Sequence, residues 1–262
     1  MSLAQAVLLG VVQGLTEFLP VSSRGHLALV QRLLPGFSQP GLVFDVSLHV
    51  GTVTAIVAFE WRRIVDVIRQ GYAVKLAAQL LLAMAATSVL ALPLRRWAED
   101  AINYPLLIAA GFAVTAALLL AVRRARGDID GPNMRWGAAA FIGFAQGLVV
   151  LLPGMSRSGT TIVAGLAAKL ERRWAADFSF LLSIPAILGA ALVEGWTHRA
   201  ELAAARGVVV PMLAGALTAA LVGFAALVLV RRLVQDGRLY LFAWYLLPLA
   251  VVTASLHFMS VW

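Results

Sequence analysis

A short polar motif occurs twice in a chain that is otherwise almost entirely apolar. Residues 13–24 read QGLTEFLPVSSR and residues 146–157 read QGLVVLLPGMSR, so seven of the twelve positions are identical. An ionisable side chain at bilayer depth costs about 2.5–3.5 kcal/mol on the insertion scale and usually has a function. A polar motif present in two copies therefore predicts two halves that meet to build one polar site.

The composition indicates an integral membrane protein. Of the 262 residues, 61% are hydrophobic and 13% are charged, and the mean hydropathy is +0.88. A soluble domain of this size does not need so much apolar surface. The chain has no cysteine, which excludes disulfides and thiolate chemistry. Its net charge of +8 comes from arginines that flank predicted spans, so we expect the lipid bilayer as a partner and no nucleic acid.

Hydropathy predicts six transmembrane helices. A helix needs about 20 apolar residues to cross the bilayer, and the segments of this length lie near 42–60, 75–94, 104–123, 176–196, 208–230 and 239–260. Two further apolar stretches, 3–34 and 136–170, are interrupted by PVSSRG and PGMSRSG. A proline followed by small polar residues stops one helix and lets another begin. Because broken backbone at membrane depth must be buried or line a wet cavity, we expect two re-entrant helix pairs.

One re-entrant pair and three spans occur twice, so the sequence predicts an all-α integral membrane protein with an inverted repeat. We expect a single membrane domain over 1–262, with repeat 1 at about 1–124 and repeat 2 at about 134–262. Each half crosses the bilayer an odd number of times, which gives the halves opposite orientations. Fourteen Lys and Arg residues fall in the predicted cytoplasmic loops, against four in the outer loops: Arg95, Arg96, Arg199 and Arg206. The positive-inside rule then places both termini outside.

The second copy of the motif has the features of an anion site. A turn leads there into a helix N-terminus through Ser156, Arg157, Ser158, Gly159, Thr160 and Thr161. Free backbone N–H groups, hydroxyls and an arginine suit phosphate, since a guanidinium donates two parallel hydrogen bonds. The spacing is not that of a P-loop. An alternative interpretation is a helix break whose arginine is satisfied by backbone carbonyls.

The first copy carries groups that can react. Glu17 lies three residues before the proline, and its cationic partner would be Arg24 or Arg157. Ser23 and His26 are three residues apart, which puts them on one helix face. A serine with a nearby general base is the usual arrangement of a nucleophile. This cluster, opposite Arg157, therefore favours chemistry over a purely structural role.

Other polar residues are candidates for supporting the site. Asp45 and His49 are four residues apart and share a helix face. They form either a hydrogen-bonded pair at the rim, or a pair near the site that supports its reacting groups or binds a cation. Gln13 and Gln146 open the two copies of the motif. Ser22, beside the predicted nucleophile, is a candidate phosphate contact.

Both motifs resemble the signature motifs of the undecaprenyl-diphosphatase family of the bacitracin-resistance type. The similar stretches are QGLTEFLPVSSxGH at 13–26 and PGxSRSG at 153–159, together with FDV at 44–46 and HVGT at 49–52. The similarity extends over essentially the whole chain. It implies a phosphatase of the bacterial cytoplasmic (inner) membrane that removes the terminal phosphate of undecaprenyl diphosphate, regenerating the lipid carrier for peptidoglycan. It also implies inverted repeats, a homodimer, and a site open to the outer or periplasmic face.

The resemblance extends to individual site residues. Glu17, Ser23, His26 and Arg157 match the positions that are essential in the family. Arg24 is a departure, because the family usually has threonine or another small residue there. A second guanidinium could contact the phosphate, or it could neutralise Glu17, and the sequence leaves both interpretations open.

These residues predict phosphoryl transfer. We expect Arg157 and the helix start at 156–161 to hold the diphosphate and stabilise its charge. Ser23 attacks or positions the attacking water, while Glu17 or His26 accepts the proton. A divalent cation, Mg²⁺ or Ca²⁺, can accompany the diphosphate. Glu17 is its candidate protein ligand, although the sequence shows no dedicated metal cage.

Two other functions fit parts of the pattern. Inverted repeats with broken helices also occur in secondary transporters, where a centre lined by arginine and serine could bind an anionic solute or lipid. An acid-phosphatase-like lipid phosphatase is disfavoured, because the chain lacks that family's Lys-x6-Arg-Pro and Ser-Arg-x5-His elements.

Overall fold

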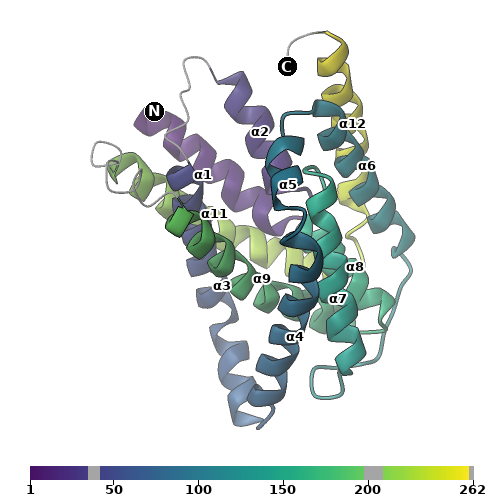
Figure 1. The fold of residues 1–262 in the computed structure, drawn as a ribbon. Coiled ribbons are helices and arrows are strands. Elements are labelled where there is room, and N and C mark those ends of the chain that lie inside the picture. Colours follow the sequence, from purple (N-terminus) through teal and green to yellow (C-terminus); the bar gives the residue numbers. More distant parts are fainter. Residues whose placement is uncertain (35–41, 198–208, 260–262) are drawn as a thin grey trace.

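The computed structural model describes residues 1–34, 42–197 and 209–259, and these residues fold into a bundle of α-helices (Figure 1). The helices are α1 (Leu3–Phe18), α2 (Ser23–Leu33), α3 (Leu42–Arg69), α4 (Ala73–Ala91), α5 (Arg95–Ala101), α6 (Pro105–Ala121), α7 (Trp136–Leu148), α8 (Arg157–Ala167), α9 (Arg172–Thr197), α11 (Val209–Gln235) and α12 (Leu241–Phe258). A single 3-10 turn, η1 (Val149–Leu151), extends α7. The predicted all-α class is confirmed.

Each of the six predicted spans overlaps a long helix, namely α3, α4, α6, α9, α11 or α12. By length and composition, four helices of the described residues can cross a membrane: α4, α9, α11 and α12. A fifth span results if α5 and α6, which meet at 105°, count as one broken element. The chain is thus a multi-pass membrane protein, and the count of six spans stays a prediction.

The two predicted helix breaks are present at the polar motifs. In the first, α1 ends at Phe18 and α2 starts at Ser23; in the second, η1 ends at Leu151 and α8 starts at Arg157. A serine caps the new helix in both cases. The hydroxyl of Ser22 accepts a hydrogen bond from Gly25 N at 3.3 Å, and Ser156 caps α8 in the same way. Such caps satisfy N–H groups that a helix start leaves unpaired.

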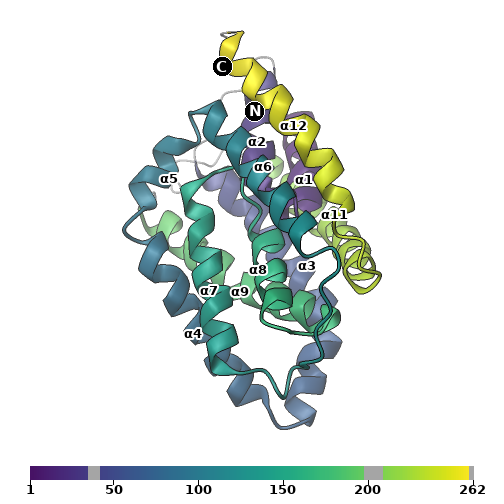
Figure 2. The same cartoon turned by 90° about the vertical axis from the view of Figure 1, so that its right-hand side faces the viewer.

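Each broken pair packs against a helix of the other predicted repeat. Helix α1 lies along α11, and α7 lies along α4. Glycines permit the close approach, because a Cβ on Gly10 would lie 2.5 Å from Gly215 O and a Cβ on Gly143 would lie 2.1 Å from Ala83 O. This reciprocal packing directs both breaks toward the middle of the bundle. Helix α12 lies along α6 at one side of it (Figure 2).

One helix was not predicted. The region around 95–101 was expected to be part of an outer loop, but it forms the short helix α5. The indole of Trp97 donates a hydrogen bond to Leu151 O over 3.1 Å. Helix α5 therefore covers the second break, a role that hydropathy could not reveal in so short a segment.

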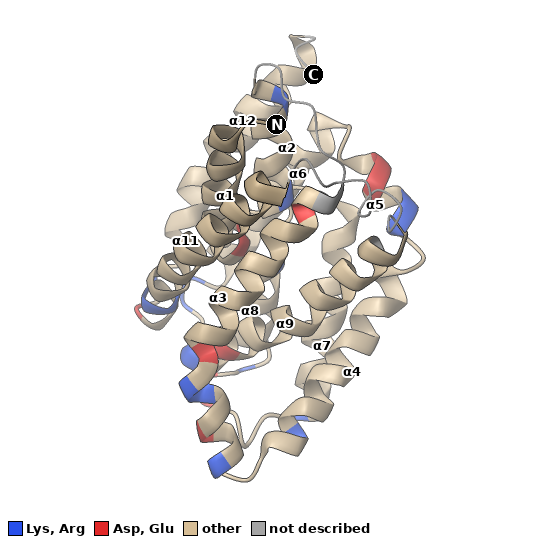
Figure 3. Ribbon diagram, turned by 90° about the vertical axis from the view of Figure 1, so that its left-hand side faces the viewer, with Lys and Arg blue, Asp and Glu red and all other residues tan. Residues whose placement is uncertain are grey.

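Charge is unevenly distributed along the bundle. Figure 3 shows most of the basic ribbon at the end where α3 is followed by α4, opposite the N-terminus. Two of the four predicted outer arginines, Arg199 and Arg206, lie outside the described residues. The separation agrees with the charge pattern on which the predicted orientation rests.

A group of buried charges lies among α3, α9 and α11. Glu60 is fully buried and Asp177 is 1% exposed. Arg231 donates to both carboxylates, reaching Asp177 Oδ1 over 3.0 Å, and Arg63 Nε lies 3.4 Å from Asp177 Oδ2. Buried carboxylates need such partners, so this cluster joins three helices in the basic half of the bundle.

Candidate active site

Glu17 connects the two copies of the motif. It lies in the last turn of α1, is buried, and uses both carboxylate oxygens. Oε2 accepts a hydrogen bond from Ser23 Oγ at 2.6 Å, and Oε1 accepts one from Arg157 Nη2 at 2.5 Å. Of the two cations that the sequence offered as its partner, Arg157 makes the ion pair. A carboxylate so close to a serine hydroxyl is placed to accept its proton.

Gln13 and His49 border the same carboxylate. Gln13 Nε2 donates to Glu17 Oε2 over 3.0 Å and lies 2.9 Å from His49 Nδ1. Because an amide nitrogen can only donate, His49 Nδ1 is the acceptor. The predicted nearness of His49 to the site is therefore seen, whereas Asp45 lies one turn earlier and accepts from Gln31 Nε2 at 3.3 Å.

Two serine hydroxyls join the breaks to each other. Ser22 Oγ, on the first break, donates to Pro153 O on the second over 2.9 Å. Ser158 Oγ, on the second, donates to Leu19 O on the first over 3.2 Å. Ser156 caps α8 through Gly159 N at 3.1 Å. These three hydroxyls hold the backbone of the two tips in place.

Two polar groups at the start of α8 lack a partner in the part of the chain that the structure describes. Arg157 Nη1 and Thr160 Oγ1 are buried, and neither makes a hydrogen bond within the described residues. Unpaired buried donors are rare and call for an explanation. A bound oxyanion at this helix N-terminus would satisfy both. Thr161 differs, because its hydroxyl lies 2.6 Å from Ser179 Oγ and donates to backbone carbonyls.

His26 lies beside the site but turns away from Ser23. Its Nδ1 is 2.7 Å from Ser22 O, and its Nε2 is 2.8 Å from the hydroxyl of Tyr245 on α12. Ser23 and His26 do share the first turn of α2, as their spacing predicts. The hydroxyl of Ser23, however, donates to Glu17. Tyr245 is a site residue that could not be found from the sequence, since no motif marks it and it lies 219 residues from His26.

The remaining predicted residues point elsewhere. Gln146, the counterpart of Gln13, donates to Thr87 Oγ1 on α4 over 2.9 Å. Arg24 is exposed and donates to Ala98 O on α5 over 3.2 Å. The two glutamines therefore have different surroundings despite their equivalent places in the repeat.

The described residues contain no group of three or more His, Asp or Glu side chains that could hold a metal ion. Both oxygens of Glu17, the candidate ligand, already accept hydrogen bonds. Within the described residues, Glu17 therefore has no group of acidic or histidine ligands around it that would hold a cation.

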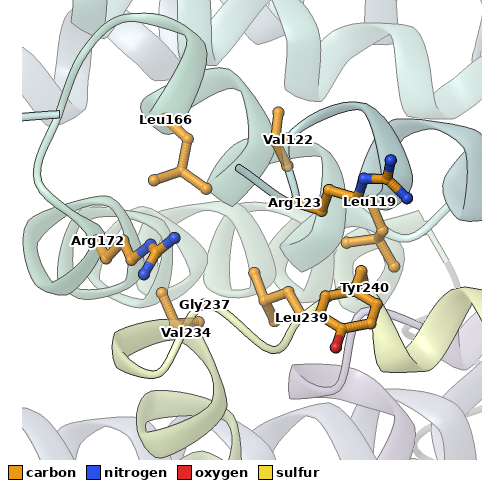
Figure 4. A pocket seen from close by; sticks show the side chains of 9 residues that line it. All are labelled: Leu119, Val122, Arg123, Leu166, Arg172, Val234, Gly237, Leu239 and Tyr240. Carbon is orange, nitrogen blue, oxygen red and sulfur yellow. The ribbon is translucent and has the colours of Figure 1, made fainter. Parts of the chain in front are cut away.

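A small cavity lies at a different place in the fold. It has a volume of about 10 Å³, enough for about one water, between α6, α8 and the turn from α11 to α12. Figure 4 shows Arg172 and Tyr240 among its lining side chains. No residue of the two motif copies lines it, and it is too small for a diphosphate.

The chain is similar to known proteins along most of its length. A family model described as bacitracin resistance protein BacA matches residues 6–252. An undecaprenyl-diphosphatase of Desulfosudis oleivorans is 43% identical over 272 residues, which cover 95% of this chain and 96% of that protein. Proteins of the same name from Treponema denticola and Desulforapulum autotrophicum are 38% and 36% identical; the alignments cover 96% and 99% of this chain and 96% and 100% of those proteins.

Proposed function

This chain belongs to the bacitracin resistance protein BacA family, and we propose that it hydrolyses undecaprenyl diphosphate to the monophosphate and phosphate. The observation that carries the proposal is that the two copies of the motif lie together and contribute different groups to one site. Ser23 is hydrogen-bonded to the Glu17 carboxylate at 2.6 Å. Arg157, which pairs with the same carboxylate, and Thr160, one turn further along α8, each have a buried donor, Nη1 and Oγ1, with no partner among the described residues. Ser23 and Glu17 are suited to nucleophilic attack on phosphorus, and Arg157 and Thr160 are suited to donating hydrogen bonds to the phosphate oxygens.

The reaction follows from these positions. Glu17 takes the proton of Ser23, whose Oγ forms a bond to the terminal phosphorus. The bond from that phosphorus to the bridging oxygen breaks, and the prenyl monophosphate leaves. Water then hydrolyses the phosphoserine and releases phosphate. Arg157 stabilises the charge that develops on the transferred group, which is the main catalytic task in phosphoryl transfer.

A divalent cation would bind together with the substrate. The carboxylate of Glu17 is occupied by Ser23, Gln13 and Arg157, so Mg²⁺ or Ca²⁺ would be held chiefly by the diphosphate oxygens.

The site would face the outer side of the bacterial inner membrane, as part of a homodimer. Support for the orientation comes from the basic end of the bundle, which the positive-inside rule assigns to the cytoplasm (Figure 3). The prenyl tail would lie against the apolar helices. On the outer face of α3, one turn beyond His49, a hollow of about 450 Å³ is lined by Val53, Thr54, Val57, Ala58 and Trp61, which offers apolar surface close to the head group.

Phosphate release from undecaprenyl diphosphate by the purified protein tests the proposal. We expect stoichiometric monophosphate and phosphate from the wild type, and none from Ser23→Ala. Repeating the assay with a chelator tests the cation. The absence of release from any prenyl diphosphate, together with movement of the lipid across liposomes, would instead favour a transporter, whose broken inverted helices this fold shares.

A further inference from the structure

His26 is held by a hydrogen bond at each ring nitrogen and by two neighbouring aromatic rings. Nδ1 lies 2.7 Å from Ser22 O, and Nε2 lies 2.8 Å from the hydroxyl of Tyr245. The rings of His26 and Tyr245 are stacked, with centroids 5.8 Å apart and planes at 17°. Phe112 of α6 contacts the ring edge-on at 5.3 Å. Two helices distant in sequence, α6 and α12, therefore hold a residue of α2 in place.

These contacts determine the tautomer of the imidazole. A backbone carbonyl can only accept, so the proton must be on Nδ1. Nε2 of the neutral ring then carries a lone pair, which accepts from the Tyr245 hydroxyl. A ring bonded in this way has no basic nitrogen directed at Ser23, whose own hydroxyl donates to Glu17.

The carbonyl that His26 holds belongs to the most unusual residue of the site. Ser22 has φ +71°, and it is one of two non-glycine residues with positive φ in the described chain. Such backbone persists only when its surroundings enforce it. Ser22 O accepts from the backbone N–H of His26 at 3.2 Å and from the imidazole at 2.7 Å. The next residue is Ser23, so this turn sets the direction of the predicted nucleophile.

We propose that Tyr245 and His26 are positioning residues, which hold the strained Ser22 turn and thereby aim Ser23 at Glu17. Tyr245 keeps His26 in the Nδ1–H form, and His26 uses that proton to fix Ser22 O. Glu17, which accepts the hydrogen bond of Ser23, is then the general base for the attack. The inference rests on the proposed hydrolysis, and it gives a helix of the second repeat a task in the chemistry of the first.

Substitutions of His26 separate positioning from base catalysis. An asparagine amide places an N–H close to where Nδ1 lies, but it has no basic nitrogen, whereas glutamine extends past that point. We expect His26→Asn to retain most of the wild-type kcat. His26→Gln should lose about 100-fold, the size expected when a reacting group is displaced by about 1 Å. If His26→Asn and His26→Gln are equally inactive although both fold, the positioning role is refuted.

Tyr240, the N-cap residue of α12, provides a matched control for the hydroxyl of Tyr245 on the same helix. Tyr245→Phe should lower kcat about tenfold with KM unchanged, since it removes one hydrogen bond behind the nucleophile. Tyr240→Phe removes a hydroxyl that lines the distant small cavity of Figure 4 and should leave kcat as it is. Wild-type kcat in Tyr245→Phe would overturn the assignment of Tyr245.

A spectroscopic measurement tests the pair without relying on activity. The chain has four histidines, so ¹⁵N spectra of histidine-labelled protein can be assigned to His26 by difference with His26→Asn. We expect the signals of a neutral Nδ1–H tautomer, and an altered Nε2 signal in Tyr245→Phe. A neutral Nε2–H tautomer would overturn the proposal. If the wild type hydrolyses no prenyl diphosphate, hydrolysis itself is refuted, while the tautomer still reports on the His26–Tyr245 pair.

Discussion

Arg157 has two tasks in the site, and a lysine can carry out only one of them. Nη2 donates to Glu17 Oε1 over 2.5 Å, whereas Nη1 is buried and has no hydrogen-bond partner among the described residues. An ammonium keeps the positive charge beside Glu17, but it lacks the planar fork that presents a second donor. Arg157→Lys should therefore fold normally and lose the phosphate contact.

The structure sets the expected size of the loss. Removing one preorganised donor from a developing oxyanion costs about 10²–10³ in kcat, or about 2.7–4 kcal/mol, and we expect Arg157→Lys to lie in this range. Arg157→Ala also removes the charge, and a catalytic arginine is worth about 10³–10⁵. It would further leave Glu17, which is 6% exposed, without its cation, at a cost of about 3–5 kcal/mol in stability.

Initial rates and thermal inactivation distinguish the two tasks. Phosphate release from a prenyl diphosphate measures the first, and the temperature at which the detergent-solubilised protein loses its gel-filtration peak measures the second. Arg157→Lys should be slow but stable, while Arg157→Ala should be slower and less stable. Near-wild-type kcat in Arg157→Lys would show that the unpaired edge of the guanidinium does not contact the transferred phosphate.

Four other substitutions have definite outcomes. Thr160→Val should lower kcat/KM about tenfold without loss of thermal stability, because it removes a buried hydroxyl that has no partner among the described residues. Thr161→Val should lower thermal stability and leave kcat/KM unchanged, since that hydroxyl is bonded within the protein. Arg231→Ala should destabilise the fold by about 3–5 kcal/mol, seen as faster thermal inactivation, because Glu60 loses its cation far from the reaction. Arg24→Thr should preserve the rate and its pH profile, since Arg24 donates to a backbone carbonyl; a shifted profile would show that it acts on Glu17.

The sequence could predict the helices and the two breaks because both depend on local composition. Long apolar runs must span or pack in the bilayer, and a proline followed by serine and glycine ends one helix and caps the next. Recurrence of the break also showed that the two copies have to be considered together. The ion pair of Glu17 with Arg157 was one of two alternatives that this reasoning allowed.

Side-chain partners between distant helices could not be predicted. Thr160 and Thr161 are adjacent and alike in sequence, yet only Thr161 faces Ser179 of α9. Nothing near Tyr245 signals that it lies against His26, and Glu60 meets Arg231 only because α3 and α11 pack together. Such pairings depend on the rotation of each helix about its axis, which tertiary packing decides.

A rapid-quench experiment tests most directly whether the two motif copies build one hydrolytic site. The purified protein is mixed with a prenyl diphosphate labelled in its terminal phosphate and stopped within a single turnover. We predict label on Ser23 that appears before free phosphate and then decays. Ser23→Ala should show no labelled protein, and neither should wild-type protein when the labelled substrate is diluted with an excess of unlabelled substrate before mixing. Full activity of Ser23→Ala, or turnover of the wild type without labelled protein at any time, would contradict the account.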